Sequence, residues 1–179
     1  MKTKLIFIVF LFICAHGYSQ VFSGEKLGRQ EKKALRAERQ IEREKEVALF
    51  MKDTTFILEA TRAGGQYVNP NLYFVYLEKN RVVVQTGLMN ETDVKKWSGI
   101  TMEGLITNMK IKKSKKGAST SINGILTTSL GMYRIDFRIS PSGRATATLK
   151  NMNNEDRIDF SGSLVSPARS KVYQGGPIY

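Results

Sequence analysis

Few residues in this chain have side chains suited to catalytic chemistry. The sequence holds one cysteine and one histidine, Cys14 and His16, and both lie in an N-terminal segment that we expect to be removed. Without them, thiol nucleophiles, histidine general bases and zinc sites built on Cys or His are excluded. The carboxylates Glu155, Asp156 and Asp159 lie close together at a predicted turn, where Asp and Glu are ordinary. We therefore expect no catalytic residue, metal ligand or cofactor.

Five lysines within seven residues form the densest charge cluster in the chain. They occupy the tip of a predicted hairpin and are Lys110, Lys112, Lys113, Lys115 and Lys116. One interpretation is an anion-binding tip. The other is a solvated turn that protects its strands from pairing with another sheet edge. Aromatic residues do not interleave the lysines, which disfavours nucleic acid as the partner.

A group of aromatic residues suggests a binding site for an apolar ligand. Tyr67, Tyr73, Phe74, Tyr76 and Trp97 could line a concave site of the kind that small β-barrels offer. Packing in a core or on a sheet surface explains most of them equally well. Trp97 is the hardest to explain as a core residue, because the sequence around it is polar.

The N-terminus has the three regions of a secretory signal peptide. Lys2 and Lys4 precede an apolar run over residues 5–15, and small and polar residues follow up to Ser19. The pattern predicts a signal peptide over residues 1–19. At roughly 1.5 Å per residue the apolar run spans about 16 Å, short of the roughly 30 Å of a bilayer core. We expect no transmembrane anchor after cleavage.

Cys14 raises the alternative of a lipoprotein, whose precursor carries a cysteine at the cleavage point. Ile13 stands directly before it, where lipoprotein peptidases require a small residue. The sequence therefore favours Cys14 as one more apolar residue of the signal peptide.

The charge of the chain indicates which partners to expect. The formal net charge is +12, and a basic protein outside the cytoplasm is suited to anionic lipid, lipopolysaccharide or acidic glycans, with an envelope protein as a further candidate partner. Export makes nucleic acid a poor candidate. Solubility alone would also account for a net charge of this size. We expect the protein in the periplasm, at the outer membrane or outside the cell.

The segment after the signal peptide predicts one long charged helix. Helix-forming residues dominate from Glu25 to Met51, and the predicted arm covers residues 20–52. A narrow apolar stripe repeats every seven residues through Ile41 and Ala48, with Leu49 beside it. Such a helix leans one thin edge on the domain or on a partner and is otherwise solvated.

Residues 53–179 are expected to form one antiparallel β domain with a frayed C-terminal tail. Aromatic and β-branched residues alternate with polar ones, and a change of phase near Asn108 predicts a β-bulge. About eight strands with short connections predict an all-β meander that forms a small barrel or a two-layer sandwich. The expected strands cover residues 55–61, 72–78, 81–88, 100–111, 119–128, 133–139, 144–150 and 158–164.

The order of segments resembles a known bacterial family. An exported helix rich in Lys, Arg and Glu is followed by "DTTFILEATRA", "GITMEGLITNMKIKKSKKGASTSINGIL" and "FSGSLVSPARSKVYQGGPIY". This pattern resembles the family called domain of unknown function 4251 over roughly Glu25 to Tyr173. The resemblance implies an envelope protein of Bacteroidetes-type bacteria with an all-β core, and it supplies no catalytic residue.

Three functions are compatible with these features. The sequence favours an exported, non-catalytic binding or interaction module of the envelope. A lipocalin-like carrier of a small apolar ligand and a hydrolase that uses carboxylates are the alternatives.

Overall fold

The computed structural model describes residues 28–87, 99–114, 119–154 and 156–172, and the predicted signal peptide lies outside them. The chain divides into two compact units between Glu38 and Arg39. The first turns of the helix α2 thus belong to one unit, and its last turns belong to the unit that holds the strands. The elements are α2 (Arg29–Asp53), β1 (Thr55–Ala63), β2 (Gln66–Tyr67), β3 (Phe74–Glu78), β4 (Arg81–Gln85), β5 (Thr101–Lys113), β6 (Thr120–Thr128), β7 (Gly131–Ile139), β8 (Arg144–Asn151) and β9 (Arg157–Val165).

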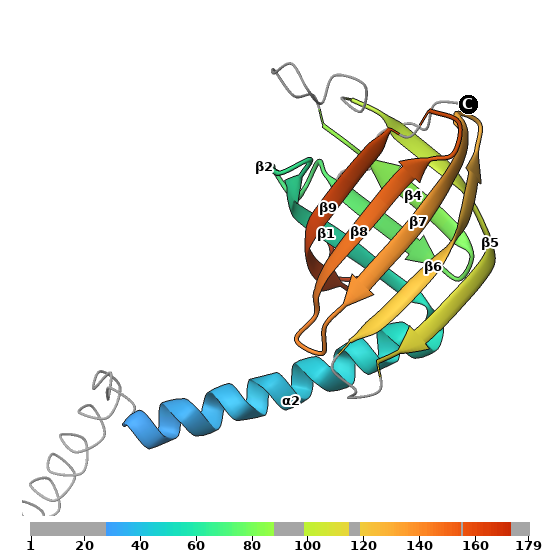
Figure 1. Ribbon diagram of the computed structural model, residues 1–179. Coiled ribbons are helices and arrows are strands. Elements are labelled where there is room, and N and C mark those ends of the chain that lie inside the picture. Colours follow the sequence, from blue (N-terminus) through green and yellow to red (C-terminus); the bar gives the residue numbers. More distant parts are fainter. Residues whose placement is uncertain (1–27, 88–98, 115–118, 155, 173–179) are drawn as a thin grey trace, which may run out of the picture. The chain divides into compact units, whose positions relative to one another are not determined.

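The strands form a closed antiparallel barrel of eight strands (Figure 1). Strand β1 pairs with β3, the order then follows the chain from β3 to β9, and β9 pairs back onto β1. The two-residue β2 adds a short pairing at the end of β1. The sequence left a barrel and a sandwich open, and the pairing of β1 with β9 decides for the barrel. Closure gives each of the eight strands a neighbour on both sides.

Two local features let the strands bend around the barrel. The predicted bulge is present, because the register of β5 shifts between Thr107 and Lys110 and Asn108 has a positive φ of 52°. On β9, Gly162 lies in the inward-facing phase, and a Cβ there would lie 1.9 Å from the carbonyl oxygen of Glu59. Glycine is therefore required where β9 closes on β1, since any side chain would meet backbone.

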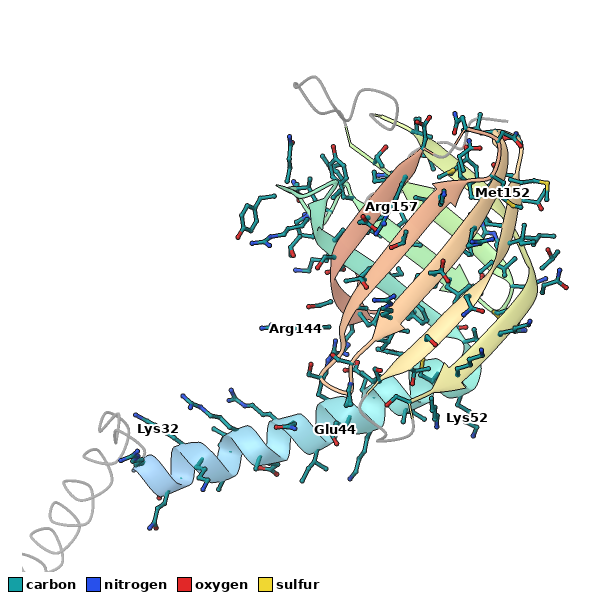
Figure 2. The ribbon with its side chains drawn as sticks, in the orientation of Figure 1. Lys32, Glu44, Lys52, Arg144, Met152 and Arg157 are labelled. Carbon is teal, nitrogen blue, oxygen red and sulfur yellow. The ribbon has the colours of Figure 1, made fainter. Side chains whose placement is uncertain are left out.

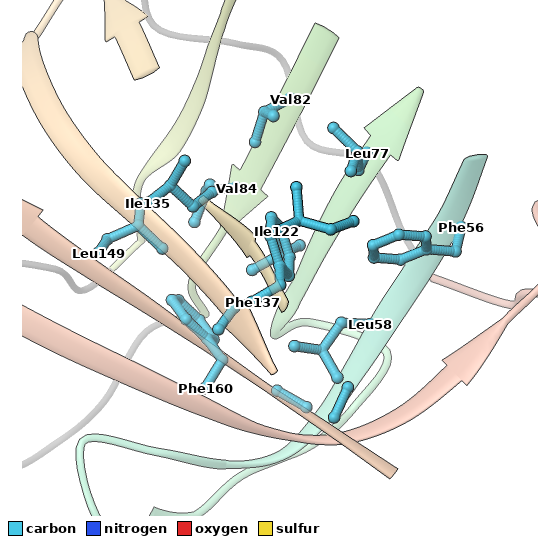
Figure 3. Close-up of a cluster of buried hydrophobic side chains, with 14 of the residues drawn as sticks. Phe56, Leu58, Leu77, Val82, Val84, Ile122, Ile135, Phe137, Leu149 and Phe160 are labelled. Carbon is cyan, nitrogen blue, oxygen red and sulfur yellow. The ribbon is translucent and has the colours of Figure 1, made fainter. Parts of the chain in front are cut away.

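The interior of the barrel is filled with apolar side chains (Figure 3). The rings of Phe56 and Phe137 meet edge to face, with centroids 5.5 Å apart. Every strand of the barrel contributes, because alternate residues face inward and these are the apolar ones. The largest fully buried side chains of this interior are Phe56, Phe137, Phe160, Leu58, Leu77, Met102, Ile122, Leu126, Ile135, Ile139 and Leu149.

The last turns of α2 join this core. Val47 and Phe50 are each only 6% exposed and pack in the same cluster as the barrel interior. The stripe predicted from the seven-residue repeat is on another side of the helix, with Ile41 54% and Leu49 58% exposed. The helix therefore does lean on the domain, but through a pair of residues that the repeat does not contain.

A polar cluster fixes the same part of the helix to the barrel. The guanidinium group of Arg43 donates to the carbonyl oxygens of Leu164 and Ser142 and pairs with Glu46. Glu46 also pairs with Arg169, which follows the last strand. Burial lowers the pKa of Arg43, a cost that the two carbonyls and the carboxylate offset. These contacts join α2 to the turn between β7 and β8 and to the end of β9.

The segment after β9 runs back along the outside of the barrel. The Ser170 hydroxyl donates to Glu59 on β1 at 2.7 Å. Val172 packs on a small apolar cluster outside the barrel, formed by Ile57, Phe74, Val83 and Tyr76. The described part of this segment ends at Val172.

Candidate functional site

The outer surface of strands β5 to β9 is a polar sheet that carries many cations. Inward residues on these strands are mostly apolar and outward residues are mostly polar, as expected of a strand with one wet face, although the outward Leu105 and Met132 are exposed apolar residues. In Figure 2, the labelled side chains of Arg144 and Arg157 lie on the outside of the barrel. We call this surface the basic face and define it by the outward residues Arg62, Lys110, Lys112, Ser121, Asn123, Arg134, Asp136, Arg138, Arg144, Thr146, Thr148, Lys150, Arg157, Asp159 and Ser161.

The strand register arranges these side chains in rows that cross the sheet. One row consists of three cations directly opposite one another on neighbouring strands, Arg134 on β7, Lys150 on β8 and Arg157 on β9. Like charges in this arrangement repel each other, and the pairing of Arg157 with Asp159 offsets part of that repulsion. The barrel fold does not require cations at outward positions, so this row is a candidate for binding an anion.

A second row mixes cations with hydroxyl groups. It runs from Lys112 through Ser121, Arg138, Thr146 and Ser161 to Arg62 on β1. Because neighbouring strands lie about 4.8 Å apart, this row presents donors and acceptors at regular intervals across the face.

The third row contains the two carboxylates of the basic face. It runs from Lys110 through Asn123, Asp136 and Thr148 to Asp159. Asp159 accepts hydrogen bonds from Arg157 at 2.9 and 3.1 Å and from the hydroxyl of Thr148. The bond to Asp159 raises the pKa of Arg157, so this guanidinium is held in place and charged.

Several charged groups of the basic face bond to no other residue in the described part of the chain. Among the residues that the structure describes, the side chains of Arg134, Asp136, Arg138 and Arg144 make no hydrogen bond or ion pair with another residue. Their charges are thus available to a ligand.

Two hollows give the basic face its shape. The first, of about 660 Å³, lies over β6 to β9, and the second, of about 720 Å³, extends over β7 to β9 toward β1. Arg138, Thr146 and Ser161 line both, so the two form one continuous surface. Tyr67 lines the second hollow, and the guanidinium of Arg62 lies 4.3 Å from the centre of its ring.

The predicted lysine cluster is divided by the structure. Lys110 and Lys112 lie on the basic face, opposite Asn123 and Ser121. Lys113 is one position out of phase and lines a hollow beside α2. Lys115 and Lys116 lie outside the described residues. The described lysines therefore join two different surfaces instead of forming one tip.

Among the predicted aromatic residues that the structure describes, Phe74 and Tyr76 share the outer apolar cluster, and the others lie elsewhere. Tyr73 is 3% exposed and its hydroxyl donates to the carbonyl of Gly87 at 2.8 Å, so it is part of the core, and burial raises its pKa. Tyr76 faces the opposite way, toward the outer apolar cluster. Tyr67 is 78% exposed, and Trp97 lies outside the described residues.

The carboxylates near the last turn have local partners. Asp156 accepts from the amide of Asn154 at 2.8 Å, and Asp159 belongs to the pair with Arg157. Glu155 lies outside the described residues. Within the described ranges no three of His, Cys, Asp and Glu lie close enough to hold a metal ion. None of the helices described there is long and apolar enough to cross a bilayer.

Comparison with known families identifies the domain. A model of the family described as "Domain of unknown function (DUF4251)" matches residues 38–164. The chain belongs to this family. The match begins next to Arg39, where the compact unit that holds the barrel also begins, so the DUF4251 domain includes the last turns of α2.

A solved DUF4251 structure has the same fold. The crystal structure of a DUF4251 family protein from Bacteroides eggerthii matches with a TM-score of 0.61 at 22% identity. The match covers 72% of this chain and 90% of the other. A search of curated proteins found no match.

The arginines of the basic face were missed in the sequence because they are scattered along it. Arg134, Arg138, Arg144 and Arg157 never form a local cluster. They gather because consecutive antiparallel strands place alternate residues on one surface. The available signal was the presence of cations at outward positions of two successive predicted strands, residues 133–139 and 144–150.

Proposed function

We propose that this protein is an exported, non-catalytic binding module of the cell envelope, which attaches to an anionic envelope component through the basic face. The arginines Arg134, Arg138 and Arg144 carry this proposal, because their side chains lie on one surface and bond to no other residue that the structure describes. A bound anion would supply the partner that their charges lack.

Export supports the envelope as the place of action. The N-terminal pattern through Lys2, Lys4 and Ser19 is that of a signal peptide, and anionic lipid, lipopolysaccharide and acidic glycans are the abundant anions outside the cytoplasm. The basic face is suited to any of these by charge. A binding role, as opposed to catalysis, follows from the residue types, since the chain after the signal peptide has neither Cys nor His.

The carrier alternative is disfavoured by the packing of the barrel. Phe56, Phe137 and Phe160 fill the interior together with the other buried side chains. A hollow of about 240 Å³ lies at one end, lined in part by Met102 and Tyr133. Pockets that bury drug-sized ligands are usually about 300 to 1,000 Å³, so this hollow is small for a carrier.

Binding to lipopolysaccharide by charge-matched variants tests the proposal. The first variant combines Arg134→Gln, Arg138→Gln and Lys150→Gln on the basic face. The second removes the same charge from the start of α2, with Lys32→Gln, Lys33→Gln and Arg36→Gln. We expect the first variant to bind several-fold more weakly than the natural protein at low salt, and the second to bind like it.

Salt should abolish the difference, because the Debye length falls from about 10 Å at 0.1 M to about 3 Å at 1 M ionic strength. If both triple variants bind lipopolysaccharide equally weakly, net charge alone would explain the binding, and a specific role of the basic face would be contradicted.

A further inference from the structure

The basic face is chemically mixed, and this restricts the kind of anion that fits it. Hydroxyl groups of Ser121, Thr146 and Ser161 lie between the cations of the row that ends at Arg62. A hydroxyl both donates and accepts a hydrogen bond, so this row can bind hydroxyl groups of a ligand as well as its charges.

The Asp136 carboxylate adds a second restriction. It lies in the first hollow, between the rows that contain Arg134 and Arg138, and no described residue bonds to it. An ionised carboxylate accepts hydrogen bonds and donates none. It would repel a closely spaced series of phosphates, whereas the O–H groups of a sugar would donate to it.

An exposed aromatic ring lies at the far side of the face. Tyr67 is 78% exposed, lines the second hollow and is held by Arg62, which stacks on the ring and donates to its hydroxyl. An exposed ring held in this way offers an apolar surface of the kind on which the C–H groups of a sugar ring pack.

The first hollow lacks the features of a membrane-inserting surface, and the exposed apolar residues Leu105 on β5 and Met132 on β7 line neither hollow. The apolar residues that line the first hollow, Phe137 and Phe160, are fully buried members of the core. They offer no side chain that could enter a bilayer. The strand spacing of about 4.8 Å is close to the length of one sugar unit, so a chain laid across the strands would meet a new side chain at each sugar.

We propose that the anionic ligand of the basic face is a linear acidic polysaccharide, which lies across strands β5 to β9 with its charges on the cations, its hydroxyl groups on Asp136 and the serine and threonine hydroxyls, and one sugar ring on Tyr67. This inference rests on the proposed function, because it names the chemical class of ligand for the same surface.

Four probes and three single variants test the assignment. The probes are polygalacturonate, dextran sulfate, inorganic polyphosphate and vesicles of phosphatidylglycerol with phosphatidylcholine. We expect Tyr67→Ala to weaken binding of the two polysaccharides by roughly 3- to 10-fold, the range that aromatic contacts give. Binding of polyphosphate and vesicles should not change. Tyr67→Phe keeps the ring and should bind the polysaccharides like the natural protein.

Asp136→Asn should act in opposite directions on the two kinds of polymer. Removing the negative charge should strengthen polyphosphate binding, while polygalacturonate loses a strong hydrogen-bond acceptor and should bind more weakly. A change that merely disturbs the fold is not expected to strengthen the binding of one polymer and weaken the binding of the other.

The outcomes separate this inference from the proposed function. If polyphosphate or vesicles bind at least as tightly as the polysaccharides and Tyr67→Ala affects neither class, the polysaccharide assignment is wrong, while the proposed anion-binding role stands. If none of the four probes binds in a salt-dependent way, the polysaccharide assignment is wrong, and if lipopolysaccharide does not bind either, the proposed function is wrong as well.

Discussion

Individual charged residues on the barrel serve either stability or the proposed binding role, depending on their neighbours. Arg157 and Asp159 form a pair with two hydrogen bonds. Arg134 has no partner within the described residues and lies directly opposite Lys150. The first kind of residue holds the surface in place, and the second kind costs stability unless an anion is bound.

Replacing Arg134 should therefore stabilise the protein while weakening its binding. In Arg134→Gln one member of the row of like charges is lost, and we expect the free energy of unfolding at low salt to rise by a few tenths of a kcal/mol, up to about 1 kcal/mol. Urea unfolding in low and high salt measures this, since screening should remove the gain. A variant less stable than the natural protein at low salt would show that Arg134 makes favourable contacts.

A second residue-level prediction concerns acid sensitivity. Arg81 donates to Glu103 at 2.6 Å, and this bond lowers the pKa of Glu103 below its ordinary 4.5. A carboxyl with a lowered pKa stabilises the fold above its ordinary pKa, and that stabilisation is lost as the pH falls through the pKa in the folded protein. Because the pair is partly exposed, its contribution is at most about 1 kcal/mol.

At neutral pH, Glu103→Gln should thus unfold at a lower urea concentration than the natural protein. At a pH well below the ordinary carboxyl pKa, the two proteins should unfold at the same urea concentration. Glu78→Gln is the control, since Glu78 lies 3.6 Å from Arg81 and should matter less. A difference between Glu103→Gln and the natural protein that persists in acid would exclude the ionic explanation.

Among the elements, α2 differs most from its expected role. Val47 and Phe50 pack in the barrel core, and Arg43 bonds to the end of β9. The exposed residues of α2 are solvated, whereas Val47 and Phe50 in its last turns belong to the barrel core.

Alanine substitutions at two adjacent positions of α2, one buried and one exposed, compare how much each side of the helix contributes to stability. Phe50→Ala removes a buried ring and should lower the free energy of unfolding by about 3 to 5 kcal/mol. Leu49→Ala removes part of a side chain that is 58% exposed. This substitution should change the free energy of unfolding by less than about 1 kcal/mol. Chemical unfolding of both variants gives the comparison, and similar losses for the two would mean that the helix end does not close the core.

The elements themselves could be predicted from the sequence, but their contacts could not. Period-two alternation gave most of the strands, and the change of phase at Asn108 gave the bulge. The buried helix residues were missed because Val47 and Phe50 do not follow the repeat of Ile41 and Ala48. Which helix residues are buried depends on where the helix meets the end of the barrel, and this is a property of the tertiary structure. The basic face was missed for the same reason, since strand register assembles it.

For the whole molecule, closure of β1 on β9 defines the domain. The family match from residue 38 and the compact unit from Arg39 agree on where it begins. Both include the turns of α2 that carry Val47 and Phe50. The domain is therefore the barrel together with the end of its helix.

Truncation at two points tests this boundary. A chain that begins at Arg39 keeps Arg43, Val47 and Phe50, and we expect it to melt cooperatively near the temperature of the full protein. A chain that begins at Lys52 loses the helix residues of the core and should melt at a much lower temperature or without cooperativity. Thermal circular dichroism distinguishes the two. If the shorter chain is as stable as the longer, the helix lies outside the folding unit.

The pairing of β1 with β9 also sets how the protein would respond to mechanical force. Ile57, near the start of β1, lies opposite Val165, at the end of β9, so the chain enters and leaves the barrel at one end. Tension between the two chain ends would open the hydrogen bonds of this pair one after another, as in unzipping, instead of shearing them together. The contacts of Arg43 with Leu164 and of Glu46 with Arg169 lie at that end and would be loaded first. Under tension the barrel would thus open along this seam, and strands β5 to β8 would be the last to feel the pull.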